Sequence, residues 1–422
     1  MGAQIRSSFL LIVFFFLSAC TPSATALPAT FSASTPSPVP SVAPSDAPTK
    51  TPLPPQPSKV VILSHAEKIS QLVGDYDRER EVPTHNLTGE RYGLERTDLG
   101  VPFQHNGRTY ILFGDAWDPP DDPIAYSNDT DPEDGLDLIF LQKENGSYLP
   151  IEIPGVSLDG FEVPMEGVSV DDKMYVYATT DHSAENVMGR SVVARSDDDG
   201  YSFTYLYDLS TQHFINVSVV KVDAAELEKL PAQGGAGLMI FGSGDYRQSD
   251  VHLAFQPAAA IEAPETIQYF AGLDAADLPM WSTQEADAQA LFNQPCVGEL
   301  SVSYNAFIGK WIMLYNCDSN ALRGINLRTA DDPWGPWTDA EIIFHPWDDE
   351  GYCHFIHVSH DFDDCDAVHD AGRENEWGGE YGPYQFENLA VGDDTSTTIY
   401  FTMSTWNPYT VVLMKATLQL VP

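Results

Sequence analysis

The chain has 422 residues, of which 62 are Asp or Glu and 21 are Lys or Arg, so its formal net charge at pH 7 is −41. Such an acidic chain is unsuited to binding nucleic acid or anionic lipid headgroups through charge. It suits an extracytoplasmic protein that acts on a neutral or cationic ligand, although a solvated acidic surface also accounts for most of these charges.

The N-terminal segment predicts export from the cytoplasm. Residues 1–19 carry a positive charge at Arg6 and an apolar run from Phe9 to Leu17, which is typical of a signal peptide and short for a membrane span. The sequence Leu-Ser-Ala-Cys, ending at Cys20, resembles a bacterial lipobox. It predicts cleavage before Cys20, lipidation of its thiol and attachment to the membrane at the bacterial cell surface. An ordinary signal peptide or an uncleaved anchor is the alternative.

Residues 20–59 are rich in Pro, Ser, Thr and Ala and have little apolar bulk. Such a segment cannot bury a core, so we expect a flexible, disordered tether. The folded part is then residues 60–422, a length that is normal for a β-propeller or a large barrel.

A hairpin between two aspartates is the strongest local signal in the folded part. Asn106-Gly107 lies between apolar runs, which predicts a two-residue turn with His105 opposite Arg108. Counting outward from that turn places Asp98 opposite Asp115. Directly opposed residues have Cβ atoms roughly 4.5–5.5 Å apart. Two carboxylates that close repel, which raises the pKa of one of them and predicts an acid/base pair.

An apolar strand that ends in a small, acidic or aromatic residue recurs along the chain. The five copies are residues 110–115, 174–181, 238–245, 311–318 and 398–406. Copies follow earlier alternating strands such as residues 167–170 and 299–304, and helical periodicity is nearly absent. Five repeated four-stranded units predict an all-β, five-bladed β-propeller whose inner strands surround a central axis.

In a propeller, the strand ends bring residues from different blades to one pocket. The acids expected to converge there are Asp98, Asp115, Glu166, Asp245, Glu299 and Asp318. The alternative is that these acids end strands because turns favour Asp, and we favour it for Asp181 and Asp318. For Asp98 and Asp115 we favour a functional role because they pair. Glu299, from another blade, could replace one member of that pair.

Residues 196–203, Ser-Asp-Asp-Asp-Gly-Tyr-Ser-Phe, match the Asp-box pattern. That motif is a hairpin turn found on propeller blades, in which Asp and Ser side chains bond backbone groups. A calcium loop is the alternative, but the ligand spacing of an EF-hand is missing. We therefore expect a structural turn.

Besides Cys20, the chain has four cysteines, and export to an oxidising compartment permits disulfides. Cys296 and Cys317 flank a hairpin pattern that turns near residues 305–309, so they lie nearly opposite each other. Cys353 and Cys365 bracket one local loop. We predict the pairs 296–317 and 353–365 as structural staples.

Histidines and acids gather in an apparent insertion at about residues 345–380. The histidines are His345, His354, His357, His360 and His369. His and carboxylate groups suit divalent metals, but the spacing lacks a recognised zinc signature. A solvated lid over the propeller mouth is favoured, and we expect no cofactor.

Four motifs resemble, in the same order, the family first catalogued as domain of unknown function 4185. They are residues 96–100 with 110–117, residues 298–304 with 310–315, residues 327–337, and residues 403–409 with 411–414. The similarity covers about residues 74–420. That family is similar to five-bladed glycoside hydrolases, and its members have been assigned as endo-acting D-arabinanases of glycoside hydrolase family 183. These enzymes cut the arabinofuranose polymers of mycobacterial walls.

The resemblance implies that Asp98 and Asp115 are catalytic and that the chain is an endo-D-arabinanase, which the predicted lipid on Cys20 would anchor at the surface. The insertion at about residues 345–380 departs from the family pattern. The family is also broad, so another furanose or pyranose polymer is a possible substrate. Asp98 and Asp115 would supply a proton for the leaving oxygen and a nucleophile or activated water. Which of them is the acid, and whether the anomeric configuration is retained or inverted, stay open.

Sugar binding needs flat aromatic rings and hydrogen-bonding groups, alongside the acids named above. The candidates at predicted strand ends are Trp117, Arg247, Asn316, Tyr381, Tyr384 and Trp406. Packing in the core or rim is the alternative for each. The competing functions are a non-catalytic glycan-binding propeller and an interaction scaffold with an exposed apolar patch. We expect a monomer whose partners are a polysaccharide and, through the lipid on Cys20, the membrane.

Overall fold

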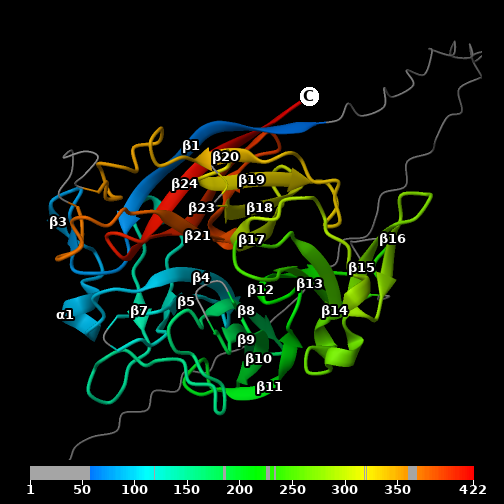
Figure 1. The fold of residues 1–422 in the computed structure, drawn as a ribbon, viewed down its shortest axis with the longest axis horizontal. Coiled ribbons are helices and arrows are strands. Elements are labelled where there is room, and N and C mark those ends of the chain that lie inside the picture. The colour runs from blue at the N-terminus through cyan, green and yellow to red at the C-terminus, as the bar shows by residue number, and fades with distance from the viewer. Residues whose placement is uncertain are drawn as a thin grey trace, which may run out of the picture. The chain divides into compact units, whose positions relative to one another are not determined.

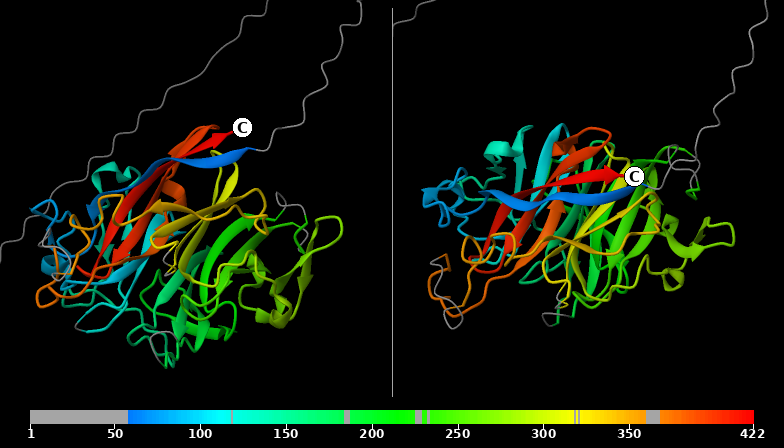
Figure 2. Two further views of the ribbon diagram at one scale, coloured as in Figure 1. Left: turned by 45° about the horizontal axis from the view of Figure 1, so that its top comes forward. Right: turned by 90° about the horizontal axis from the view of Figure 1, so that it is seen from above.

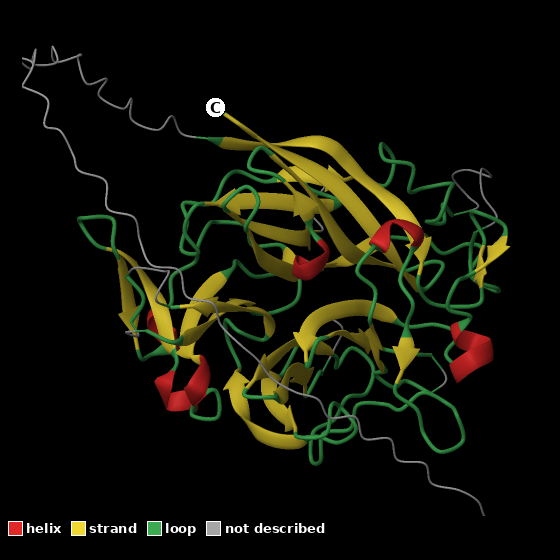
Figure 3. Cartoon of the chain, turned by 180° about the vertical axis from the view of Figure 1, so that it is seen from behind, coloured by secondary structure: helices red, strands yellow, loops and turns green. Residues whose placement is uncertain are grey.

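Strands dominate the computed structural model of the protein, and its few helices are short (Figure 1; Figure 3). It describes residues 58–422, apart from residues 118, 184–186, 225–228, 232–233, 318, 320 and 360–367. The predicted signal peptide, Cys20, most of the tether, Asp318, His360 and Cys365 therefore lie outside the described residues. Within the described part, no helix has the length and apolarity to cross a membrane.

Five antiparallel sheets of four or five strands form the blades, which confirms the predicted all-β five-bladed propeller. The first blade contains β4 (Asp98–His105), β5 (Arg108–Gly114), β6 (Ile124–Ser127) and β7 (Ile139–Phe140). The second contains β8 (Pro164–Val170), β9 (Lys173–Thr180), β10 (Arg190–Ser196) and β11 (Thr204–Ser210). The third contains β12 (Asn216–Asp223), β13 (Ala236–Ser243), β14 (His252–Pro257), β15 (Gln268–Leu273) and β16 (Pro279–Ser282).

The fourth blade contains β17 (Val297–Asn305), β18 (Lys310–Cys317), β19 (Ile325–Ala330) and β20 (Glu341–Phe344). The fifth contains β21 (Glu380–Gln385), β22 (Val391–Gly392), β23 (Ser396–Thr405), β24 (Thr410–Val421) and β1 (Lys59–Gln71). The remaining elements are the pair β2 (Tyr76–Asp77) and β3 (Val82–Pro83), helix α1 (Thr88–Tyr92), and the 3-10 turns η1 (Pro132–Asp134), η2 (Ala258–Ala260), η3 (Pro264–Thr266), η4 (Glu285–Asp287) and η5 (Glu387–Leu389).

The innermost strands β4, β8, β12, β17 and β21 contact one another in that order around the ring, and β21 returns to β4. The ring is closed because strands from the two ends of the folded part pair with each other in the fifth blade. β1 pairs antiparallel with β24, so that Lys59 lies opposite Val421 (Figure 2, blue beside red). The last blade therefore needs the N-terminal strand for completion.

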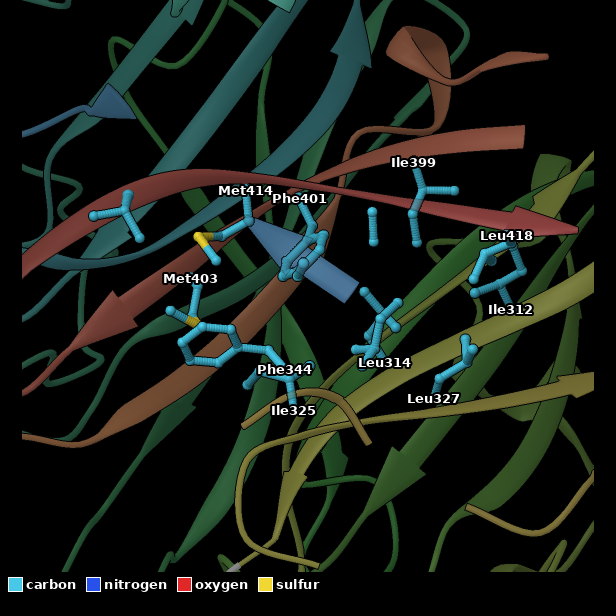
Figure 4. Close-up of a cluster of buried hydrophobic side chains, with 14 of the residues drawn as sticks. Ile312, Leu314, Ile325, Leu327, Phe344, Ile399, Phe401, Met403, Met414 and Leu418 are labelled. Carbon is cyan, nitrogen blue, oxygen red and sulfur yellow. The ribbon is translucent and has the colours of Figure 1, made fainter. Parts of the chain in front are cut away.

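Five hydrophobic clusters hold the blades together, one at each interface between neighbouring blades. Figure 4 shows the cluster between the fourth and fifth blades, where Ile312 and Leu314 of β18 meet Phe401 and Met403 of β23. Each second strand contributes to two clusters, because alternate side chains point to opposite faces of a strand. In β5, Ile111 packs toward the fifth blade and Leu112 toward the second. This double burial explains why the repeated strands are apolar throughout.

The first hairpin turns at Asn106-Gly107 as predicted, with His105 opposite Arg108. The predicted register fails beyond Val101, because a β-bulge at Gly100 shifts the pairing by one residue. Asp98 therefore lies opposite Gly114 and not opposite Asp115. Gly100 has a φ of 89°, a conformation that favours glycine.

Two further sequence features are visible in the blades. In the Asp-box turn, Ser196 and Ser202 donate hydrogen bonds of 2.8 and 2.7 Å to the carboxylate of Asp198. Cys296 and Cys317 form the disulfide that their positions predict, with Cα atoms 5.1 Å apart. The second predicted pair includes Cys365, outside the described residues, and stays a prediction.

Candidate active site

Each blade presents the start of its first strand and the end of its second strand at the same edge, because the two strands are antiparallel. A cavity of about 470 Å³, here called the main cavity, is lined by these positions from all five blades. A smaller cavity of about 270 Å³, the rear cavity, is lined by the other ends of the inner strands. Tyr384 contributes to both.

The main cavity brings together most of the residues that the sequence singles out. These are Asp98, Asp115, Arg247, Glu299, Asn316, Tyr381, Tyr384 and Trp406. Trp117, Glu166 and Asp245 lie elsewhere in the described structure. Trp117 stacks behind Tyr409, with ring centroids 5.0 Å apart, and Asp245 is exposed just after β13.

Asp98 begins β4 and is 6% exposed. Its Oδ2 accepts a 2.8 Å hydrogen bond from the Tyr381 hydroxyl, whereas its buried Oδ1 has no partner among the described residues. Burial and, next, the charge of Asp115 raise the pKa of Asp98 well above its usual value, against the lowering effect of the hydrogen bond from Tyr381. Of the two aspartates that line the cavity, Asp98 therefore holds a proton more readily than Asp115 does.

Asp115 follows β5 in a left-handed conformation, with φ 41°. Both of its carboxylate oxygens accept the backbone N–H of Phe161, at 3.0 and 2.9 Å. Burial raises the pKa of Asp115, while the Phe161 N–H and the nearby His182 lower it. Asp122, buried behind the pair, accepts the N–H of Asp115 at 2.9 Å and fixes its backbone. The two aspartates thus share one cavity although they are not directly opposed.

Acceptor oxygens without protein donors line the opposite wall. Asn316 is 3% exposed, and its Oδ1 has no partner in the described part of the chain. Oε2 of Glu299 likewise has no partner among the described residues, whereas its Oε1 accepts a 2.7 Å hydrogen bond from Tyr246. Gly298 leaves room for this arrangement, because an added Cβ would lie 2.7 Å from Asn316 Nδ2. Unpaired buried acceptors are costly, so these oxygens take donors from water or from the hydroxyl groups of a ligand in the cavity.

An aromatic wall stands at the fifth blade. Trp406 lines the main cavity and is 37% exposed. Its indole N–H donates to Glu376 at 2.6 Å, and the Arg373 guanidinium lies 4.5 Å from its ring centroid. These contacts fix the ring in one orientation. A fixed, partly exposed aromatic ring suits stacking against the apolar face of a sugar.

Glu166 does not join the other acids, because it lines the rear cavity. Its Oε1 accepts the N–H of Gly167, and its Oε2 accepts the N–H of Val219 and the hydroxyl of Ser218. Ser218 in turn accepts the N–H of Val302 at 3.0 Å. Glu166 and Ser218 together therefore link the inner strands of three blades, which is a structural role. Burial raises the pKa of Glu166 to about 7.

Sequence reasoning missed several residues of the main cavity. Those with polar or aromatic side chains include Phe161, His182, Asn216, Tyr246, Arg323, Glu380 and Tyr409. Asn216 and Glu380 begin β12 and β21, the position that Asp98 holds in β4. The start of each inner strand was therefore a usable signal. Across the described ranges, no three His, Cys, Asp or Glu side chains gather as a metal site.

The profile of a family described as "Domain of unknown function (DUF4185)" matches residues 84–415. No curated protein matches the sequence. Solved structures with a similar fold include an exo-β-1,3-galactanase from Phanerochaete chrysosporium (8% identity, TM-score 0.42). The alignment covers 83% of this chain and 64% of the galactanase, so the chain spans less than two thirds of that protein.

Two further solved structures are similar over most of their length. A putative exo-β-1,3-galactanase from Bifidobacterium bifidum has 9% identity and a TM-score of 0.43, with 84% of this chain and 97% of that one covered. The arabinanase Arb43A from Bacillus subtilis has 10% identity and a TM-score of 0.40, with 76% and 94% covered.

Proposed function

We propose that this chain, which belongs to the DUF4185 family, is a glycoside hydrolase that cleaves a D-arabinofuranose polymer internally. The observation that carries the proposal is the pair Asp98 and Asp115 in one cavity, with burial and its neighbour raising the pKa of Asp98. Glycosidic bond cleavage needs two carboxyl groups in different protonation states. The burial and the hydrogen-bond partners of these two aspartates favour a protonated Asp98 beside an ionised Asp115.

In this mechanism Asp98 is the general acid. The Tyr381 hydroxyl donates to Oδ2 of Asp98, so the proton resides on Oδ1, the oxygen that has no partner among the described residues. Oδ1 passes the proton to the leaving oxygen of the scissile bond. Asp115, whose carboxylate accepts the Phe161 N–H, attacks the anomeric carbon or activates water. Asn316, Glu299 and the ring of Trp406 bind the sugar through its hydroxyls and its apolar face.

The same proposal places the enzyme outside the cytoplasm. The predicted lipid on Cys20 and the predicted tether would hold the propeller at the cell surface, where glycan polymers lie. Labelling of the expressed protein with a fatty-acid analogue tests this location, and loss of the label in Cys20→Ser is the expected result.

The activity is tested by incubating the purified full-length protein with D-arabinan, L-arabinan and arabinogalactan and measuring released oligosaccharides. We expect release from D-arabinan, and a loss of about 10²- to 10⁴-fold in Asp98→Asn and in Asp115→Asn. Asp245→Asn is the matched control, because Asp245 is an exposed acid outside the main cavity. Full activity of the double Asn variant, or no release from any polymer, would overturn the proposal. Binding without cleavage would instead support a glycan-binding propeller.

A further inference from the structure

Trp347, in the segment between β20 and β21, is an exposed aromatic ring held in place from behind. It is 52% exposed. Its ring centroid lies 4.7 Å from that of Tyr352 and 6.1 Å from that of Trp377. A large ring fixed by neighbours loses little side-chain entropy when a ligand stacks on it. Trp347 therefore has the properties of a sugar-stacking platform.

Tyr352 connects this platform to the main cavity. Its hydroxyl donates to the carbonyl of Gly378 at 3.3 Å and accepts a 2.6 Å hydrogen bond from Arg323 Nη2. Both Gly378 and Arg323 line the main cavity. Trp347 is thus separated from the cavity wall by a single aromatic residue. That spacing is short enough for one polysaccharide chain to occupy the cavity and contact Trp347.

Gly379 leaves open space at the wall of the main cavity, two residues after Trp377, which packs against Trp347. It lines the cavity, does not adopt a positive φ, and a Cβ added to it would meet no described atom within 4 Å. Its neighbour Gly378 differs, because a Cβ there would lie 2.5 Å from the carbonyl oxygen of Asn407. Neither backbone conformation nor packing requires glycine at residue 379. The open space at residue 379 lets a ligand pass close to the backbone.

We propose that Trp347 forms an outer sugar-binding subsite, reached from the main cavity over Gly379, on which a ring of the bound polysaccharide stacks. This inference rests on the proposed function for the identity of the polymer. It also gives a role to the first described part of the insertion, where Trp347 extends the binding surface beyond the reacting bond. A polymer would use the subsite, and an oligosaccharide that fills only the main cavity would not.

The test compares kcat/KM for D-arabinan with kcat/KM for a D-arabinofuranose trisaccharide, using the full-length protein. In Trp347→Ala the ratio of polymer to trisaccharide should fall about three- to tenfold, the range expected for one lost ring contact. The control is Tyr201→Ala, because Tyr201 is 58% exposed in the Asp-box turn and lines neither cavity. Its ratio should equal that of the wild type.

A binding measurement separates this inference from the proposed reaction. Affinity for uncleaved D-arabinan is measured by calorimetry in Asp98→Asn and in the double variant Asp98→Asn with Trp347→Ala. Weaker binding by the double variant supports the subsite even if the wild type cleaves nothing, in which case only the hydrolase proposal fails. The subsite proposal is overturned if the two variants bind D-arabinan equally well or if neither binds it. It is also overturned if the ratio of kcat/KM values is unchanged in Trp347→Ala.

Discussion

Asp98 and Asp115 differ in what surrounds their oxygen atoms. Asp115 has both oxygens held by one backbone N–H, which stabilises the carboxylate. Asp98 is more deeply buried and has one oxygen bonded to a tyrosine and one without a described partner. The acid and the base are thus distinguished by their burial and by their hydrogen-bond partners, and not by residue type. Because the sequence contains two aspartates, it cannot separate the two roles.

Tyr381→Phe tests how the proton on Asp98 is controlled. The Tyr381 hydroxyl bonds to Oδ2 and lowers the pKa of Asp98, so its removal raises that pKa further. Because the general acid must be protonated, the basic limb of the kcat/KM profile should move to higher pH. Tyr384→Phe is the control, since Tyr384 lines the same cavity and no bond from it to Asp98 is seen in the described structure. A basic limb that stays in place or moves to lower pH contradicts the assignment of Asp98 as the acid.

At the scale of the strand, the bulge at Gly100 decides where Asp98 points. Thr402 donates a 2.9 Å hydrogen bond to the Gly100 carbonyl, and the Leu99 N–H donates to Ser404 at 2.8 Å. Both partners belong to β23 of the fifth blade. Strand β4 is therefore shaped by a blade that comes about three hundred residues later in the chain. Local pairing rules cannot include such a contact.

Gly100→Ala should lower both stability and activity. An added Cβ would lie 3.0 Å from Thr402 Cγ2 and 3.1 Å from Val411 Cγ1, at a φ of 89°. We expect a loss of about 1–3 kcal/mol in the free energy of unfolding, together with slower catalysis as Asp98 shifts. Gly107→Ala is a matched control, because Gly107 also has a positive φ but its Cβ would meet no described atom within 4 Å. That variant should lose stability and keep its activity. Equal activities of the two variants would show that the bulge does not position Asp98.

The first hairpin shows how far the sequence alone could predict the elements. The Asn106-Gly107 turn and the register from Val101 to His105 follow from local rules and are confirmed. The error begins at Gly100, where contacts with another blade take over. Asn216 and Glu380 were missed because the candidates came mainly from the ends of the repeated second strands, whereas these two residues begin inner strands. Trp117 was expected at the cavity and instead packs behind Tyr409, which alternation along a strand cannot predict.

At the scale of the whole molecule, buried polar side chains join neighbouring inner strands. Glu166 connects β8 to β12 through Val219, and Ser218 connects β12 to β17 through Val302. Ser301 then accepts the N–H of Gln385, which connects β17 to β21. These links run near the central axis, while the five hydrophobic clusters lie between the blades. The ring is therefore held both at its axis and between its blades.

Glu166→Gln tests the axial link through the pH dependence of stability. Burial raises the pKa of Glu166 from 4.5 to about 7, so the folded state binds its proton more tightly than the unfolded state does. Its contribution to stability is then complete below pH 4.5 and is lost as pH rises through about 7. Over that window the wild type should lose about 3 kcal/mol relative to Glu166→Gln, which cannot ionise. Denaturation with urea at several pH values measures the difference.

Asp245→Asn is the control, because Asp245 is an exposed acid, and its stability curve should be parallel to that of the wild type. If the stability curve of Glu166→Gln is also parallel to that of the wild type, Glu166 is already ionised in the folded ring. The hydrogen bonds that it accepts from Ser218 and Val219 then hold a negative charge at the axis.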